Sequence, residues 1–355
     1  MTILTVVGAR PQFIKAAPVS KALKERGIRE FLLHTGQHYD TTMSQVFFDE
    51  LEIPAPEINL GIGSCSHGKQ TGRMLEDIEI HLFEQKPDIL LVYGDTNSTL
   101  AGALAAAKLH IPVAHIEAGL RSYNRKMPEE HNRVLTDHCS THLFCPTQTA
   151  VDNLLREGIT DNVHLVGDPM LDSTLHFLPI AKERSTILDV HGLTNGNYFL
   201  STLHRPSNVD DPTTLLSLLE ALDELPLHVI LPIHPRTQSK IQHLPKQNFG
   251  NIRTIPPVGY LDMLQLLDNA KAILTDSGGL QKEALFLNTP CITLREETEW
   301  PETLVNSTNQ LTGSNPFKIR LALDKLPESA SFTANTHFGN GKSSVRTVDK
   351  LLSLE

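Results

Sequence analysis

Short apolar runs alternate with longer amphipathic segments along the chain of 355 residues. Between the runs, apolar positions recur with a helical period, as in 70–85 and in 147–157, where Thr147 is a suitable N-cap and Gly158 a suitable stop. This alternation predicts βαβ units and parallel sheets. The expected strands form two series, the first at 3–8, 30–36, 89–94, 111–117, 142–146 and 163–167, and the second at 198–204, 228–234, 251–257, 272–276 and 291–295.

Eleven expected strands are too many for one simple sheet, and the chain is long enough for two domains of ordinary size. The segment 168–197, which separates the two series, is rich in turn-forming residues. We therefore expect an α/β protein with two Rossmann-like domains, the first over residues 1–170 and the second over residues 171–343. In such folds ligands bind at the carboxyl ends of the strands, so we expect the active site in the cleft between the domains.

Composition and charge narrow the class of protein. Hydrophobic residues make up 40% and charged residues 20%, which is typical of a soluble protein, and no apolar run approaches the roughly 20 residues of a membrane span. The N-terminus enters a strand directly, without the features of a signal peptide. A net charge of −10 argues against nucleic acid as a partner, but not against an anionic small molecule. Cys145 and Cys291 lie in apolar runs, which predicts buried free thiols and a reducing cytoplasm.

Two adjacent glycines stand between an expected strand and an expected helix in "LTDSGGLQKEAL". A helix N-terminus presents free N–H groups, and Gly278 and Gly279 would let a phosphate approach the backbone closely. Glu283 follows about one helical turn later, where its carboxylate would accept the two hydroxyls of a ribose. The segment therefore favours a nucleotide-diphosphate site. The alternative is a capped helix start that binds nothing.

Cations and carboxylates follow other strands. In "VVGARPQFIK", Arg10 and Lys15 come after the first strand, where they suit a diphosphate leaving group or form a solvated basic pair. Asp95 and Glu117 each follow an apolar strand, and Glu129, with its neighbour Glu130, opens the next helix. A carboxylate in such surroundings is costly unless it is paired or used, so these groups suit proton transfer. The alternative for Glu129 is that the helix dipole alone favours an acid there.

The sequence argues against a metal site and against a P-loop. "HTGQH" places His34 and His38 four residues apart, but His34 ends an expected strand, so the two do not share a helix face. "FGNGKSS" resembles the end of a P-loop, but Thr336 stands where the first glycine belongs. We therefore expect no metal and no P-loop.

Together the segments resemble the non-hydrolysing UDP-N-acetylglucosamine 2-epimerases over nearly the whole chain. The motifs are "GARPQFIKAAP", "HTGQH", "YGDTNSTLAGALAA", "HIEAGLRS", "MPEEHNR", "LTDSGGLQKEA", "TEWPE" and "GNGKSS", in this order. The resemblance implies a glycosyltransferase-B-like fold whose C-terminal helix, 344–355, crosses back onto the N-terminal domain. It also implies a cytoplasmic, homodimeric isomerase of polysaccharide biosynthesis that needs no cofactor.

The resemblance also implies a chemistry and its residues. UDP is eliminated to leave an enzyme-bound 2-acetamidoglucal, and it adds back while a proton arrives on the opposite face, which interconverts UDP-N-acetylglucosamine and UDP-N-acetylmannosamine. The implied acid–base carboxylates are Asp95, Glu117 and Glu129, with Lys15 near the sugar, and the implied UDP contacts are Arg10, His204, Ser277, Gly278, Gly279 and Glu283.

Departures from the family pattern leave the sugar open. The short segment before "PEE" contains Arg125 and Lys126, a basic pair that would suit a carboxylate at carbon 6 or is simply solvated. Several motifs are close to the branch acting on UDP-2,3-diacetamido-2,3-dideoxyglucuronate. We expect UDP-N-acetylglucosamine first and this glucuronate as the alternative. A UDP-sugar-dependent glycosyltransferase is a more distant alternative, which the three grouped carboxylates disfavour.

Many bacterial members of this family bind a second UDP-N-acetylglucosamine as an activator. The residues at the corresponding positions are Gln37, Gln45, Arg73 and Arg205. Pro206 and Ser207 replace the charged pair that usually follows Arg205, and proline removes a backbone donor and fixes φ. We therefore expect any activator site to be weakened or altered.

Overall fold

The computed structural model describes residues 1–37, 48, 50–233, 235–326 and 336–353. Contacts divide the chain into two compact units, which we call unit 1 (Met1–Leu175 with Asn335–Glu355) and unit 2 (His176–Ala334). The limits expected from the sequence, at residues 170 and 343, lie a few residues from these.

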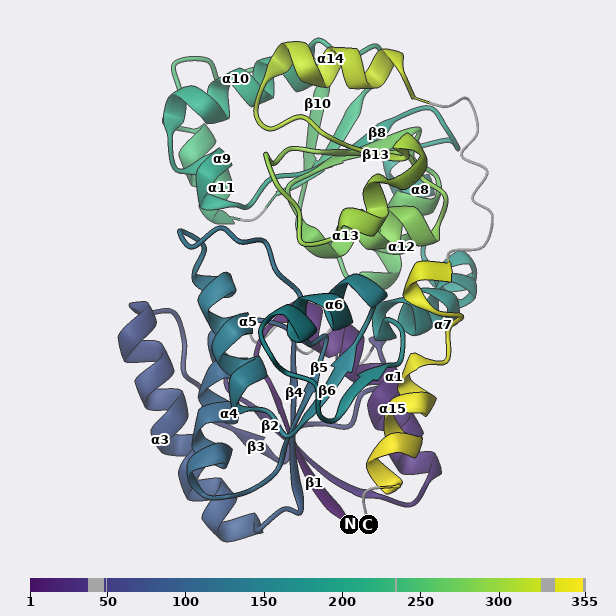
Figure 1. Cartoon of the computed structure of the whole chain (residues 1–355). Coiled ribbons are helices and arrows are strands. Elements are labelled where there is room, and N and C mark those ends of the chain that lie inside the picture. Colours follow the sequence, from purple (N-terminus) through teal and green to yellow (C-terminus); the bar gives the residue numbers. More distant parts are fainter. Residues whose placement is uncertain (38–47, 49, 234, 327–335, 354–355) are drawn as a thin grey trace. The chain divides into compact units, whose positions relative to one another are not determined.

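Unit 1 contains a seven-stranded parallel sheet in the order β3-β2-β1-β4-β5-β6-β7 (Figure 1). Its strands are β1 (Thr2–Val7), β2 (Arg29–His34), β3 (Ile58–Asn59), β4 (Ile89–Tyr93), β5 (Val113–Ile116), β6 (His142–Cys145) and β7 (Val163–Leu165). Its helices are α1 (Arg10–Glu25), α3 (His67–Gln85), α4 (Asn97–Lys108), α5 (Pro128–Cys139), α6 (Gln148–Arg156), the first part of α7 (Pro169–Arg184), a 3-10 turn at Thr336–Phe338 and α15 (Ser343–Leu352).

Unit 2 contains a six-stranded parallel sheet in the order β10-β9-β8-β11-β12-β13. Its strands are β8 (Phe199–Thr202), β9 (Val229–Pro232), β10 (Ile252–Ile255), β11 (Ala272–Thr275), β12 (Cys291–Thr293) and β13 (Asn309–Leu311). Its helices are α8 (Ile187–His191), α9 (Pro206–Val209), α10 (Pro212–Asp223), α11 (Pro235–Ile241), α12 (Tyr260–Asp268), α13 (Gly278–Phe286), α14 (Pro316–Asp324) and a 3-10 helix at Pro301–Ser307.

Alternating side chains bury both faces of each sheet. In unit 1, Leu4 and Val6 of β1 pack with Met74 of α3 and with the alanines of α4. The alanine-rich α4 lies so close to the sheet that a Cβ added to Gly102 would be 3.2 Å from Val92 Cγ1. In unit 2, α10 and α14 cover one face of the sheet, and α8, α12 and α13 cover the other (Figure 1). Sheets buried on both faces require the near-continuous apolar strands seen in the sequence.

The expected strands are all present, and two parallel sheets are confirmed. The sequence analysis missed β3 and β13, which are edge strands of two and three residues with little apolar content. It was wrong about 168–197, where α7 and α8 form instead of a turn-rich connection. Met170, Phe177 and Ala181 of α7 are buried, and their packing outweighs the cost of Pro179 inside the helix.

The smaller predictions from local sequence also hold. The Thr147 side chain accepts a hydrogen bond from the Ala150 N–H at the start of α6, and Gly158 has a φ of 80° just after that helix. Cys145 and Cys291 are buried free thiols. Along the described residues, no helix is both long enough and apolar enough to cross a membrane.

The C-terminal helix α15 belongs to unit 1 and packs beside α1 (Figure 1). The buried Asp172 carboxylate accepts hydrogen bonds from the Ser343 and Ser344 N–H groups at 3.1 and 2.7 Å, so a residue of α7 satisfies the first backbone donors of α15. Arg26, just after α1, forms an ion pair with Asp349 at 2.6 Å. The last helix is therefore held by residues that come much earlier in the chain.

Each sheet reverses its strand order once, and these reversals place the candidate site. In unit 1, β1 lies between β2 and β4, and in unit 2, β8 lies between β9 and β11. At such a switch point the loops after the two central strands diverge to opposite faces and leave a crevice at their carboxyl ends. The loops that follow β1, β4, β8 and β11 contain Arg10, Asp95, His204 and Ser277 or lead directly into them.

Candidate active site

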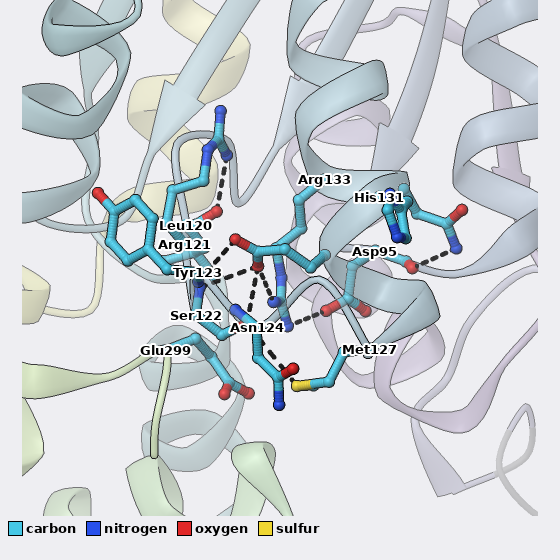
Figure 2. A network of polar contacts seen from close by, with 12 residues as sticks. Asp95, Leu120, Arg121, Ser122, Tyr123, Asn124, Met127, His131, Arg133 and Glu299 are labelled. Carbon is cyan, nitrogen blue, oxygen red and sulfur yellow. Dashed lines mark hydrogen bonds and ion pairs between the residues drawn. The ribbon is translucent and has the colours of Figure 1, made fainter.

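Asp95 follows β4 and is held by a buried arginine from α5. The Arg133 guanidinium donates through Nη2 to Asp95 Oδ2 at 2.6 Å and through Nη1 to Glu130 Oε2 at 2.9 Å (Figure 2). The Arg133 side chain is only 2% exposed, so both ion pairs lie largely out of water. Asn132 of the same helix donates to the Asp95 carbonyl at 2.9 Å. One turn of α5 therefore positions both the backbone and the carboxylate of Asp95.

Glu130, which the sequence analysis did not select, is the buried member of the Glu129–Glu130 pair. Its carboxylate accepts hydrogen bonds from the Ser122 N–H and hydroxyl, both at 2.9 Å, and from the Tyr123 N–H at 2.8 Å. Burial pushes its pKa upward, but the hydrogen bonds from Ser122, Tyr123 and Arg133 outweigh burial and hold the pKa below its usual value. Glu129 is partly exposed at the start of α5. Glu129 and Glu130 lie four and three residues before Arg133, and both spacings suit a helical ion pair, so spacing did not distinguish them.

Glu117 and Lys15 form a buried ion pair, so Lys15 is not a solvated surface cation. Glu117 comes immediately after β5, and its φ of 73° is unusual for a residue with a side chain. Its N–H donates to the Phe144 carbonyl at 3.0 Å. A Cβ added to Gly94 would lie 3.0 Å from Glu117 Oε2 and 3.4 Å from Lys15 Nζ. The structure therefore brings Lys15, Glu117 and the Gly94–Asp95 turn together.

Gln12 ties the loops after β1 and β4 to each other. Its side-chain carbonyl accepts from the Gly8 and Ala9 N–H groups at 2.8 and 3.0 Å, and its amide donates to the Tyr93 carbonyl at 2.9 Å. The sequence analysis missed this residue. The available signal was a polar side chain near the start of a helix whose neighbours are apolar. Gln12 therefore links the two loops that diverge at the switch point.

In unit 2, Asp276 organises the loops after β8 and β11. Its fully buried carboxylate accepts from the His204 and Arg205 N–H groups, each at 3.0 Å, and from Asn208 Nδ2 at 3.2 Å. His204 Nδ1 lies 2.7 Å from Asp276 Oδ1. Burial raises the pKa of Asp276, but the charge and hydrogen bond of His204 and the two N–H groups outweigh it and lower the pKa. The half-exposed His204 ring is thus oriented through Nδ1, which leaves Nε2 to face a ligand.

The space beside Gly278 is filled by a carboxylate of the protein itself. The Ser277 hydroxyl accepts from the Leu280 N–H at 3.4 Å and so caps α13. A capped helix start is what the alternative without a ligand predicts. A Cβ added to Gly278 would collide with Glu299 Oε1. Glu299 in turn pairs with Arg295 Nη2 at 2.7 Å, and both side chains are buried. An anion therefore lies at the N-terminus of α13, where the helix dipole favours it.

The remaining two UDP candidates lie one in each unit. Glu283 is buried in the middle of α13, and the neighbouring Lys282 ammonium lies 3.8 Å from the Trp300 ring centroid. Arg10 of unit 1 is partly buried at the start of α1. The roles of Glu283 and Arg10 in binding UDP stay predictions.

The four candidate activator residues are not brought into one group by the described contacts. The Gln37 carbonyl oxygen accepts from the Ser98 N–H at 3.1 Å and from its hydroxyl at 2.7 Å, at the start of α4. Arg73 is exposed on α3, and Arg205 belongs to unit 2. Gln45 lies outside the described residues. Gln37 thus already contacts the helix that begins two residues after Asp95.

Of the basic pair and the histidine pair, Arg125, Lys126 and His34 lie among the described residues. Arg125 and Lys126 are exposed, as in the solvated alternative. The His34 Nδ1 lies 3.4 Å from Asn59 Oδ1, and His38 lies outside the described residues. Within the part of the chain that the structure describes, no group of three or more His, Cys, Asp or Glu side chains is arranged to hold a metal ion.

Two doubly wound parallel sheets with polar groups at each switch point define a glycosyltransferase-B-like enzyme. A family model described as UDP-N-acetylglucosamine 2-epimerase matches residues 21–352, and the chain belongs to that family. It is 53% identical to a UDP-N-acetylglucosamine 2-epimerase homolog of Methanococcus maripaludis, with 100% of both chains covered. It is 47% identical to UDP-2,3-diacetamido-2,3-dideoxy-D-glucuronate 2-epimerase of Pseudomonas aeruginosa, again with 100% of both covered.

Solved structures give the same result. The UDP-GlcNAc 2-epimerase of Methanocaldococcus jannaschii in complex with UDP-GlcNAc and UDP is similar over 100% of both chains, with 44% identity and a TM-score of 0.93. The enzyme of Neisseria meningitidis bound to UDP-GlcNAc is similar over 99% of this chain and 100% of the other, with 33% identity and a TM-score of 0.90. The fold class expected from the sequence is therefore confirmed.

Adjacent glutamates allow a matched test of the Arg133 network. Glu130→Gln leaves a buried arginine with one partner fewer and turns an amide toward the Ser122 and Tyr123 donors. We expect it to lower the free energy of unfolding by roughly 2–4 kcal/mol. Glu129→Gln should change it by less than about 0.5 kcal/mol. Urea unfolding measures both, and equal losses in the two variants would contradict the assignment of Glu130 as the structural member of the pair.

Proposed function

We propose that the protein is a non-hydrolysing UDP-N-acetylglucosamine 2-epimerase, an isomerase that interconverts UDP-N-acetylglucosamine and UDP-N-acetylmannosamine. The observation that carries the proposal is the pairing of Glu117 with Lys15 beside the Asp95 turn, at the switch point of unit 1. Membership of the epimerase family and the polar loops at the switch point of unit 2 support it.

The chemistry explains why such groups are needed. The hydrogen on carbon 2 is not next to a carbonyl, so a carbanion there would have no stabilisation. Elimination avoids it: a base takes the proton from carbon 2 while the bond from carbon 1 to the UDP oxygen breaks, giving a 2-acetamidoglucal and UDP. UDP adds back as a proton reaches the other face of carbon 2. Both steps are redox-neutral and need no cofactor, but they need acid–base groups on two faces of the ring.

The carboxylates of unit 1 supply these groups. Glu117 is paired with Lys15, and Asp95 is paired with Arg133. Each carboxylate can therefore exchange a proton while the nearby cation compensates its negative charge. Glu129, partly exposed at the start of α5, is the third acid–base candidate. The strained φ of Glu117 indicates that its position is held by the surrounding structure and is not a relaxed turn.

The leaving diphosphate needs cations and N–H donors. We assign the phosphates to Ser277, Gly278, Gly279, Arg10 and His204, and the ribose hydroxyls to Glu283. His204 is suited to this role because Asp276 fixes its ring, so that Nε2 can donate to a phosphate oxygen and compensate charge as UDP departs.

Glu299 competes with a phosphate for the N-terminus of α13. Because its carboxylate occupies the space above Gly278, UDP binding requires this side chain to move or to accept a nearby like charge. Glu299→Gln removes the charge and also frees Arg295. We expect UDP to bind several-fold more tightly to this variant, most clearly at low salt.

Calorimetry with UDP measures this effect, and Glu296→Gln, a substitution of an exposed carboxylate nearby, is the matched control with unchanged affinity. Gly278→Ala is less informative, because the added methyl strikes Glu299 as well as any phosphate. Unchanged or weaker UDP binding by Glu299→Gln would place the diphosphate elsewhere.

The mechanism is tested by turnover in deuterated water. Deuterium should enter carbon 2 of the product, because the proton that returns comes from a group that exchanges with solvent. Glu117→Gln should lower the rate by at least roughly 100-fold, the usual scale for a positioned acid or base. Glu84→Gln, on the surface of α3, should leave it unchanged. Mass spectrometry and proton NMR of the product measure the deuterium at carbon 2. A product free of deuterium would overturn the elimination mechanism.

A second substrate is favoured by one comparison and one sequence feature. The relative of 47% identity is named for UDP-2,3-diacetamido-2,3-dideoxy-D-glucuronate, and Arg125 and Lys126 are exposed and available to a carboxylate. The same mechanism serves both sugars. Incubation with each UDP-sugar, with the products followed by NMR, identifies the substrate. We keep UDP-N-acetylglucosamine as the first proposal because more of the similar relatives are named for it.

The proposed activator site is weakened in this chain. Pro206 begins α9 and the Arg205 N–H is used by Asp276, while Gln37 already accepts from Ser98. We expect conversion of UDP-N-acetylmannosamine to proceed without added UDP-N-acetylglucosamine. Initial rates with and without a trace of that sugar measure it. A lag that disappears only when the trace is present would show that an activator is required.

We further infer a cytoplasmic homodimer that supplies polysaccharide biosynthesis. The buried free thiols of Cys145 and Cys291 suit a reducing compartment, and the family resemblance supports the dimer and the pathway. Light scattering of the purified protein tests the dimer.

A further inference from the structure

His115 has no role in the site described above, although it lies two residues before Glu117. It is fully buried on β5. Its Nδ1 lies 2.7 Å from Asp137 Oδ1 on α5, and its Nε2 lies 2.8 Å from the Gly94 carbonyl oxygen. A neutral imidazole has one N–H donor and one acceptor, so the identity of the two partners determines which protons the ring must hold.

Both partners of His115 are acceptors. A backbone carbonyl cannot donate. Asp137 is surrounded by donors, since the Gly119 N–H lies 3.1 Å from its Oδ2 and Arg121 Nη1 lies 2.7 Å from the same atom. The Arg121 cation beside Oδ2 favours the ionised form of Asp137, which then has no proton to donate to His115. Each ring nitrogen therefore needs a proton to make its hydrogen bond.

Charge compensation makes a buried imidazolium acceptable. Arg121 bridges Asp137 to Glu157, donating through Nε and Nη2 to the two Glu157 oxygens at 2.7 Å each. Arg121 thus serves two carboxylates, Asp137 and Glu157, and the more exposed His138 Nε2 also lies 3.4 Å from Glu157 Oε2. A positive charge on His115 would face a carboxylate that already shares Arg121 with Glu157.

The carbonyl held by His115 belongs to the turn that carries Asp95. Gly94 has a φ of 64°, its N–H donates to the Ile116 carbonyl at 3.0 Å, and its Cα faces Lys15 and Glu117. The same peptide leads into Asp95. A ring that lost one proton would lose its hydrogen bond either to Asp137 or to the Gly94 carbonyl. If it lost the bond to the carbonyl, the peptide between Gly94 and Asp95 could rotate.

We propose that His115 is a positioning residue, held as an imidazolium between Asp137 and the Gly94 carbonyl, which fixes the Asp95 turn against the Lys15–Glu117 pair. It touches no substrate and acts through backbone geometry. The kinetic consequence rests on the proposed epimerase function, whereas the protonation of the ring does not.

Nitrogen-15 NMR of the protein labelled at histidine tests the protonation directly. One ring should show two N–H protons at neutral pH, both lost in His115→Gln. His142→Gln, on the neighbouring strand β6, is the matched control, because His142 is also buried while its Nδ1 has no hydrogen-bond partner among the described residues. A His115 ring with a single N–H proton would overturn the proposal even if the variant failed to fold, since the wild-type protein reports it.

Kinetics test the positioning. His115→Gln should lower kcat by roughly 10- to 100-fold and slow deuterium entry at carbon 2 equally, because Asp95 and Glu117 lose their mutual geometry. The Kd of UDP and the KM should stay within about 2-fold, because the proposed phosphate donors of unit 2 are untouched. His142→Gln should keep the wild-type kcat. An unchanged kcat in folded His115→Gln, or a loss confined to UDP affinity, would overturn the role. If the wild-type protein turns over neither UDP-sugar, the proposed function fails and the NMR result still stands.

Discussion

A charge inside a protein is tolerated only when an opposite charge or several hydrogen-bond donors face it, and this constraint shapes both candidate sites. In unit 1, Glu117 faces Lys15, and Asp95 shares Arg133 with a second carboxylate. In unit 2, Asp276 is surrounded by N–H donors and His204. Removing Lys15 would take away the cation that faces the buried Glu117, and removing Arg133 would do the same for Glu130. The rigidity that catalysis needs is therefore a consequence of keeping these charges out of water.

The polar groups at the two switch points differ in their chemistry. Unit 1 presents carboxylates matched by cations, which suits groups that gain and lose a proton. Unit 2 presents backbone N–H groups, a helix N-terminus and an oriented imidazole. These groups suit an anion that stays negatively charged. Glu299 shows how strongly that helix end attracts an anion, since a side chain of the protein takes the position when it pairs with Arg295.

Local sequence was enough to predict the two parallel sheets and all of their strands except β3 and β13. A long apolar run ending in Asp95 or Glu117 is visible in a few consecutive letters, because a carboxylate at that position is energetically unusual. The missed residues depend on contacts between distant segments. Nothing near Glu130 distinguishes it from Glu129 until Arg133 and the loop at Ser122 are placed. Glu299 likewise lies beside Gly278 only once its own loop, which is distant in sequence, is placed. The helix α7 forms because its apolar contacts outweigh the cost of Pro179.

The attachment of α15 to unit 1 has a consequence for how the chain is made. A ribosome releases β1 and α1 before unit 2, and α15 after it, and domains generally fold as units during synthesis. All of His176–Ala334 has emerged before Asn335–Glu355 can close unit 1, so unit 2 can reach its native contacts while its predecessor is still incomplete. Until then the face of α1 that α15 covers and the Asp172 carboxylate lack their native partners. The nascent protein thus exposes an unfinished N-terminal unit while unit 2 is being made, and α15 completes that unit only afterwards.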